Sequence, residues 1–123
     1  MTKERILLGK EGEKIALRYL KRMGYQIIER NYRCKFGEVD IIAKDGKFLS
    51  FVEVRSGRNF IFNTPKESIT KRKQQQISKV ALNYIKRYQL TETEARFDVV
   101  SIKFSPLEED IELIKDAFEL AIT

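Results

Sequence analysis

Hydrophobic and polar residues alternate along this chain with two different periods, and the longer period comes first. Between Lys3 and Met23 apolar residues recur every three to four positions, which predicts an amphipathic helix. Gly24 follows where a left-handed helix cap is favoured. Gly9 and Gly12 are poor helix formers, so they indicate close approach by backbone or ligand. The predicted apolar stripe consists of Ile15, Ala16, Tyr19, Leu20 and Met23.

The period then shortens toward two, which is typical of strands. Three segments predict strands at Tyr25–Tyr32, Glu38–Lys44 and Lys47–Arg55. The Asp45-Gly46 pair between the last two is a strong signal for a tight hairpin. We therefore expect the second and third strands to be antiparallel neighbours.

A second helical pattern runs from Pro65, a residue suited to a first helical turn, to about Tyr88. Arg96–Phe104 predicts a fourth strand, and the tail offers a short apolar segment at Ile111–Ile114 before a turn around Asp116–Leu120. The order α-β-β-β-α-β, with a further strand in the tail, predicts an α/β domain. Its mixed central sheet would be flanked by helices.

Composition narrows the class of protein. A chain of 123 residues predicts a single domain over residues 1–123, and no apolar run approaches the ~20 residues that cross a bilayer. We expect a cytoplasmic protein. Cys34 is the only cysteine and histidine is absent, which excludes an internal disulfide, cysteine metal clusters and histidine-based catalysis. Hydrolysis would then need carboxylates with an oxygen-loving cation such as Mg²⁺ or Mn²⁺.

The net charge of +6 is unevenly distributed. A basic body with an acidic tail suggests a polyanionic partner for the body, although a solvated helix face explains such charge equally well. The basic residues between 66 and 87 are Lys66, Lys71, Arg72, Lys73, Lys79, Lys86 and Arg87, against Glu67 alone. The acidic residues of the tail are Glu108, Glu109, Asp110, Glu112, Asp116 and Glu119.

Alternation along the hairpin brings carboxylates together. Glu38 and Asp40 would share one face of the second strand, with Val39 and Ile41 on the other. On the third strand, Phe51, Glu53 and Arg55 would share a face opposite Val52 and Val54. Asp40 and Glu53 can then lie side by side, where their repulsion favours a bound divalent cation. The alternative is a solvent-facing sheet edge with ordinary surface charges.

Some residues have simpler roles. Gly37 favours a turn into the second strand, and Asn31 is best explained as a turn residue. Tyr32, Phe36, Phe60 and Phe62 could stack on nucleic-acid bases, but core or loop packing is the favoured explanation.

The combined motifs resemble the YraN family, which is similar to archaeal Holliday-junction resolvases and to the wider PD-(D/E)XK nuclease superfamily with its restriction-endonuclease-like fold. The likeness covers nearly the whole chain. The motifs that carry it are Gly12-Glu13, Asn31, Gly37-Glu38 followed by Asp40, Phe51-Val52-Glu53-Val54-Arg55, Lys73, Arg96-Phe97-Asp98-Val99-Val100 and Lys115-Asp116-Ala117-Phe118.

This resemblance implies roles for individual residues. Asp40 and Glu53 would be the metal carboxylates, and Glu13 would be a third acid from the first helix. Arg55 occupies the position of the motif's lysine. It can stabilise phosphate charge but cannot act as a base, so Lys73 would supply the missing ammonium. In addition to Lys73, three other cations are expected to contact phosphates, namely Arg58, Lys71 and Arg72.

The function expected from this resemblance is Mg²⁺- or Mn²⁺-dependent cleavage of DNA, with a preference for branched DNA. The same resemblance implies a possible homodimer, because the related resolvases cut a four-way junction twice, although the sequence shows no clear dimer stripe. Two alternatives stay open. The protein could be a nucleic-acid-binding module with a weakened site, acting in DNA repair, recombination or uptake. It could also be a protein-interaction domain whose acidic tail binds a basic partner.

Overall fold

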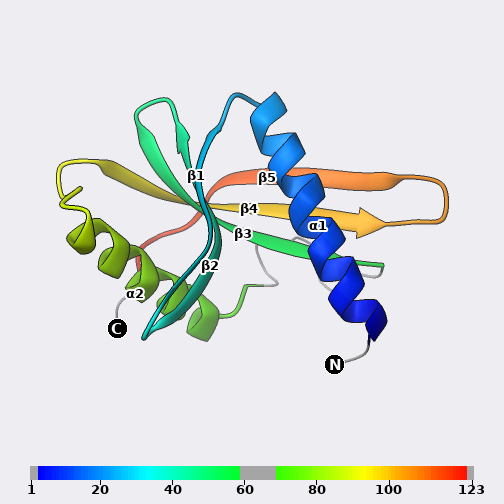
Figure 1. The fold of residues 1–123 in the computed structure, drawn as a ribbon, viewed down its shortest axis with the longest axis horizontal. Helices are drawn as coiled ribbons and strands as arrows, with labels where there is room; N and C mark the ends of the chain where they lie inside the picture. Colours follow the sequence, from blue (N-terminus) through cyan, green and yellow to red (C-terminus); the bar gives the residue numbers. More distant parts are fainter. Residues whose placement is uncertain (1–2, 59–68, 122–123) are drawn as a thin grey trace.

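The computed structural model, which describes residues 3–58 and 69–121, contains one five-stranded sheet with a helix on each face (Figure 1). The strand order is β1-β2-β3-β4-β5. This is the expected α/β class, and the tail does form a further strand. The elements are α1 (Lys3–Arg22), β1 (Gln26–Cys34), β2 (Gly37–Asp45), β3 (Phe48–Gly57), α2 (Lys71–Arg87), β4 (Glu94–Phe104) and β5 (Glu109–Phe118).

The sheet is mixed because its connections differ in length. β1, β2 and β3 form an antiparallel meander, and Gly46 takes a positive φ of 60° in the expected hairpin turn. The connection through α2 returns the chain to pair β4 parallel to β3. β5 then folds back antiparallel along β4.

β5 is longer than the tail pattern predicts. The turn expected around Asp116 is a local feature inside this strand, where Asp116 has a φ of 54° and the pairing with β4 shifts register. An edge strand needs few buried residues, and only Ala117 and Phe118 are buried here, so the usual alternation is weak.

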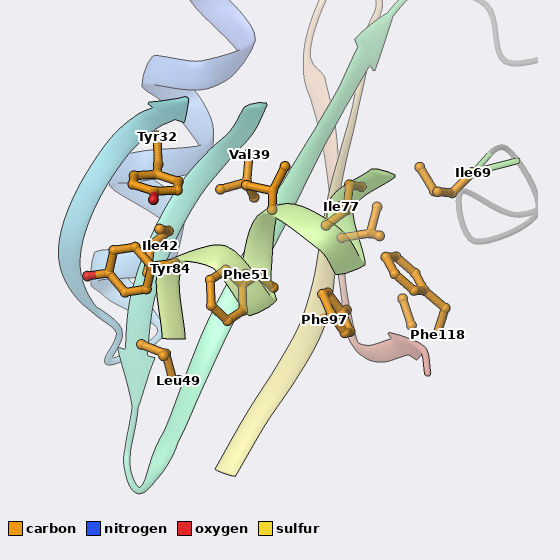
Figure 2. Close-up of a cluster of buried hydrophobic side chains, with 14 residues drawn as sticks. Tyr32, Val39, Ile42, Leu49, Phe51, Ile69, Ile77, Tyr84, Phe97 and Phe118 are labelled. Atoms are coloured by element: carbon orange, nitrogen blue, oxygen red, sulfur yellow. The ribbon is translucent and has the colours of Figure 1, made fainter. Parts of the chain in front are cut away.

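Aromatic rings dominate the core between the sheet and α2 (Figure 2). Tyr84 of α2 meets Tyr32 edge-on with ring centroids 5.0 Å apart, and Phe51 lies at 5.9 Å from the same ring. Phe97 and Phe118 stack at 4.8 Å. Such pairs add to the free energy gained from burial alone. Tyr32 is thus a core residue, as the favoured explanation held.

A second core lies between the sheet and α1. The helix buries Ile15, Ala16 and Leu20 against strand residues such as Ile41 and Val52. Met23 was expected on this stripe but is 49% exposed, because α1 ends at Arg22 and the chain turns there. Gly24 has the cap conformation predicted for it, with a φ of 93°.

α2 begins later than the sequence suggests. Thr70 caps the helix, since its side chain accepts a hydrogen bond from the backbone N–H of Lys73. Pro65, Phe60 and Phe62 lie outside the described residues. No helix within residues 3–58 or 69–121 is long and apolar enough to span a membrane.

A buried polar network ties β4 to its neighbours at the hairpin end of the sheet. Asp98 is fully buried and accepts hydrogen bonds from the Tyr25 hydroxyl (2.7 Å), the Ser50 hydroxyl (2.6 Å) and the Arg96 guanidinium (2.8 Å). Burial alone would raise the pKa of Asp98, but these donors hold it below its ordinary value. Arg96 also pairs with Asp45 at 2.6 Å.

Candidate functional site

The candidate site lies where β2 and β3 separate. Their antiparallel pairing runs from Asp45 and Phe48 to Ile41 and Val52. The next residue on each strand is Asp40 and Glu53, respectively. Asp40 Oδ2 accepts a hydrogen bond from the backbone N–H of Val54 at 2.8 Å, so this carboxylate is fixed against β3.

Strand alternation breaks at Asp40, which corrects one prediction. Val39 and Ile41 were expected on the same face, yet Val39 packs in the α2 core and Ile41 in the α1 core. Opposite Asp40, between the Arg30–Ile41 and Tyr32–Val39 pairs, lies Asn31 with a φ of 52°. This left-handed residue therefore lies opposite the position at which the alternation of β2 reverses, while the pairing keeps its register on both sides.

Glu53 is the most buried acidic group of the site, with 6% of its surface exposed. Burial, and then the charge of Asp40 and a hydrogen bond to it, raise its pKa from 4.5 to about 8. Lys73 Nζ lies 3.7 Å from Glu53 Oε2 and, with Arg55, partly opposes this rise. Glu53 therefore resists ionisation near neutral pH unless a further positive charge joins it.

Glu13 approaches the same carboxylates from α1. Its pKa is raised by partial burial and then by the charge of Asp40, while Arg30 lowers it. With its amide nitrogen turned toward two carboxylates, Asn31 donates to Glu13 Oε1 at 2.9 Å and to Glu38 Oε1 at 3.1 Å. Asn31 is thus a positioning residue inside β1 rather than part of a turn between elements.

A glycine lets α1 come this close. A Cβ at Gly12 would lie 2.6 Å from Ser56 Oγ and 2.7 Å from Ser56 Cβ, so the helix backbone packs directly on β3. The neighbouring Glu13 is thereby brought toward Asp40. The expectation of close approach is correct for Gly12, whereas the space around Gly9 is open.

The predicted cations lie around the carboxylates at different depths. Arg55 and Lys73 are half-buried and close enough to Glu53 to lower its pKa. Lys71 and Arg72 are exposed on the first turn of α2, and Arg58 is exposed just after β3. The structure therefore brings together Glu13, Asp40, Glu53, Arg55 and Lys73, and leaves the other three cations on the surface.

This donor set fits a hard divalent cation only as a partial site. Within residues 3–58 and 69–121, no three acidic or cysteine side chains are grouped tightly enough to form a cage. Asp40 and Glu53 offer two carboxylates, and the raised pKa of Glu53 reflects a burial and a repulsion that a cation would relieve. Mg²⁺ commonly accepts one or two protein carboxylates and completes its shell with water and phosphate.

An antiparallel meander, a helical crossover to a parallel fourth strand and carboxylates at the β2–β3 fork define an α/β protein of the restriction-endonuclease-like fold. The chain belongs to UPF0102, the YraN family expected from its motifs. The model of "Uncharacterised protein family UPF0102" matches residues 12–102.

Bacterial relatives match over nearly the full length. A UPF0102 protein of Geotalea uraniireducens is 54% identical over 115 residues, covering 93% of this chain and 91% of its own. One from Syntrophus aciditrophicus is 50% identical over 113 residues, covering 92% and 89%. One from Caldicellulosiruptor saccharolyticus is 47% identical, covering 90% and 96%.

Proposed function

We propose that this protein is a metal-dependent nuclease that hydrolyses phosphodiesters in DNA, with branched DNA as its preferred substrate. The observation that carries the proposal is the buried Glu53 beside Asp40, with the Lys73 ammonium 3.7 Å away. Buried, mutually repelling carboxylates cost stability, and groups of this kind cluster at functional sites. The preference for branched DNA rests on the family resemblance and on no contact of its own.

Asp40 and Glu53 would hold Mg²⁺ or Mn²⁺, which would activate water and neutralise phosphate charge when bound. The N–H of Val54 keeps Asp40 oriented. Lys73 would stabilise the charge that develops on the phosphate. Arg55 would orient the phosphate through its planar guanidinium, since it cannot release a proton at neutral pH.

A nucleic-acid-binding module with a weakened site is the second candidate. One observation favours it, namely that Arg55 stands where the related nucleases place a lysine. The same cations would then retain phosphate contacts, and the carboxylates would no longer support turnover.

A cleavage panel separates the two candidates. Single-stranded, duplex, flap and four-way-junction DNA, with RNA controls, would each be incubated with Mg²⁺, Mn²⁺ or EDTA. We expect cleavage of branched DNA with either cation. Asp40→Asn, Glu53→Gln and the double variant should lose it to the same extent, because both residues would hold one metal.

The controls keep this test interpretable. Glu112→Gln alters an exposed carboxylate on β5 and should cut normally. Arg55→Lys should preserve or raise cleavage, and all variants should still bind DNA. Equal cutting by Asp40→Asn and the unaltered protein would assign the activity to another site. Binding without cleavage under every condition would favour the second candidate.

A further inference from the structure

A second feature on the α2 side is a groove of about 290 Å³ between the β1–β2 turn and the helix. This volume is at the small end of the range for ligand sites. Three of its six lining residues are lysines, and a fourth is an aromatic ring. The lining residues are Lys35, Phe36, Lys79, Leu82, Asn83 and Lys86.

Phe36 is held in this groove by the turn that carries it. Gly37 has a φ of 135°, and a Cβ there would collide with the Gln76 side chain of α2. The turn therefore rests directly on the helix. Phe36 nevertheless leaves 40% of its surface exposed, with Lys35 Nζ 5.2 Å from the ring centroid. An exposed aromatic ring in a groove that lysines line offers a stacking surface for a base.

Asn83 adds a hydrogen-bond donor. Its Oδ1 accepts from the Tyr32 hydroxyl at 2.6 Å, which fixes the orientation of the side-chain amide. Nδ2 is then the polar atom that Asn83 can offer to a ligand in the groove. A fixed amide donor, a ring and three ammonium groups together match the carbonyl oxygens, the flat face and the phosphates of a nucleotide.

The helix α2 contributes lysines both to the groove and to the carboxylate site. Gln76, Lys79, Asn83 and Lys86 recur every three to four residues, so they share one side of the helix, and Lys73 lies one turn before Gln76 at the edge of the buried face. Lys73 contacts Glu53, and Lys86 lies thirteen residues further on. At a rise of 1.5 Å per residue this distance is about 20 Å, the span of several nucleotides of one strand.

We infer that this groove binds an unpaired nucleotide of the substrate strand, with its base stacked on Phe36 and the neighbouring phosphates on Lys79 and Lys86. The inference rests on the proposed function, because it places the same strand at Asp40 and Glu53. Binding in this groove would make the protein select DNA that exposes single-stranded nucleotides beside a duplex, as flaps and opened junctions do.

The test measures binding in EDTA, so it does not depend on cleavage. Fluorescence anisotropy would compare a 12-nucleotide thymidine strand with a blunt duplex of the same length. Phe36→Leu should weaken binding of the single strand about tenfold or more and leave duplex binding within twofold. Phe36→Trp should retain both affinities, because it keeps a stacking surface. A ribothymidine strand, which differs only in its 2′-hydroxyl groups, shows whether the groove accepts either sugar.

Salt dependence tests the lysines separately. Lys79→Gln and Lys86→Gln should each reduce the log–log salt slope on the single strand by about 0.7. Lys21→Gln, an exposed change on α1 across the sheet, is the matched control and should leave the slope unchanged. These side chains are all exposed, so unchanged melting temperatures are expected.

Two results would overturn the inference: an equal effect of Phe36→Leu on both DNAs, or unchanged slopes in both lysine variants. The proposed nuclease can fail without affecting it, because a protein that never cuts DNA can still show the predicted loss of single-strand binding. Conversely, metal-dependent cleavage with no effect of Phe36→Leu on binding would contradict the role inferred for the groove and would support the proposed nuclease function.

Discussion

Asp98 and Glu53 are both buried carboxylates, but their surroundings differ. The difference distinguishes a structural group from a candidate functional one. Asp98 receives hydrogen bonds from Tyr25, Ser50 and Arg96, which keep its pKa low although it is fully buried. Glu53 has a neighbouring carboxylate and a single ammonium at 3.7 Å, and its pKa rises to about 8. Asp98 therefore completes its own network, whereas Glu53 still lacks positive charge.

This imbalance predicts an unusual pH dependence of stability. A carboxyl group whose pKa rises from 4.5 to about 8 on folding binds its proton more tightly in the folded state. Without metal, the free energy of unfolding should therefore fall as pH rises between these values, by several kcal/mol at most. We expect the melting temperature in EDTA to decrease from pH 5.5 to 8.5, and Glu53→Gln to reduce that decrease.

This pH range lies above the acidic range in which protonation of Asp45 and Asp98, whose pKa values are lowered, would destabilise the folded protein. Glu112→Gln removes an exposed carboxylate from β5 and should keep the slope of the unaltered protein. An identical slope in Glu53→Gln would show that this group does not carry the strain assigned to it.

At the scale of elements, the sequence predicted both helices, the four strands up to β4 and the β2–β3 hairpin, because periodicity and turn residues are local signals. It could not predict the reversal of alternation at Asp40, since that depends on Asn31 in a neighbouring strand. The contact between Asn31 and Glu13 was also hidden. The sequence indicated this contact only through Gly12, which precedes Glu13. A glycine inside a helix costs stability, so it indicates a place of close packing.

The two glycines of α1 give a matched pair of predictions about packing. Gly9→Ala meets open space and should stabilise the protein by up to about 1 kcal/mol through helix propensity. Gly12→Ala gains the same propensity but forces a Cβ against Ser56, an overpacking that costs about 1–3 kcal/mol. In urea unfolding, Gly9→Ala should therefore raise the free energy of unfolding, and Gly12→Ala should lower it or raise it by clearly less.

A double-mutant cycle identifies the source of that deficit. Ser56→Gly removes the colliding side chain, so it should offset part of the cost of Gly12→Ala and none of the effect of Gly9→Ala. If Gly12→Ala proved as stabilising as Gly9→Ala, close approach of α1 to β3 would not be what holds Glu13 near Asp40.

At the scale of the whole molecule, charge is separated across the sheet. The acidic strand β5 and the strand β1 form the two edges of the sheet (Figure 1). The basic groove lies between the β1–β2 turn and α2. This separation would orient a polyanion toward the β1–β2 turn and away from the exposed acidic residues of β5. The sequence showed the two charge clusters, but their separation follows from the strand order, in which β4 inserts beside β3.

A last prediction concerns the effect of a bound metal ion on the stability of the folded protein. Repulsion among Glu13, Asp40 and Glu53 should destabilise the metal-free protein, and a cation that binds only the folded state should stabilise it. With a Kd near millimolar, ~10 mM Mg²⁺ would add about 1.4 kcal/mol, equivalent to a melting shift of several degrees. Mn²⁺ should match or exceed this shift, because it binds oxygen donors at least as tightly.

Asp40→Asn should act in two opposite directions on thermal unfolding in EDTA, Mg²⁺ and Mn²⁺ at constant ionic strength. It should stabilise the metal-free protein, since an amide can still accept from the Val54 N–H without adding charge. It should also abolish the metal-induced shift. An unaltered protein without any shift, or the same shift in Asp40→Asn, would mean that the carboxylates do not bind metal on their own. Because only Asp40 and Glu53, among the residues that the structure describes, are carboxylates in direct contact at this site, DNA phosphate would then have to complete the coordination before a cation could bind.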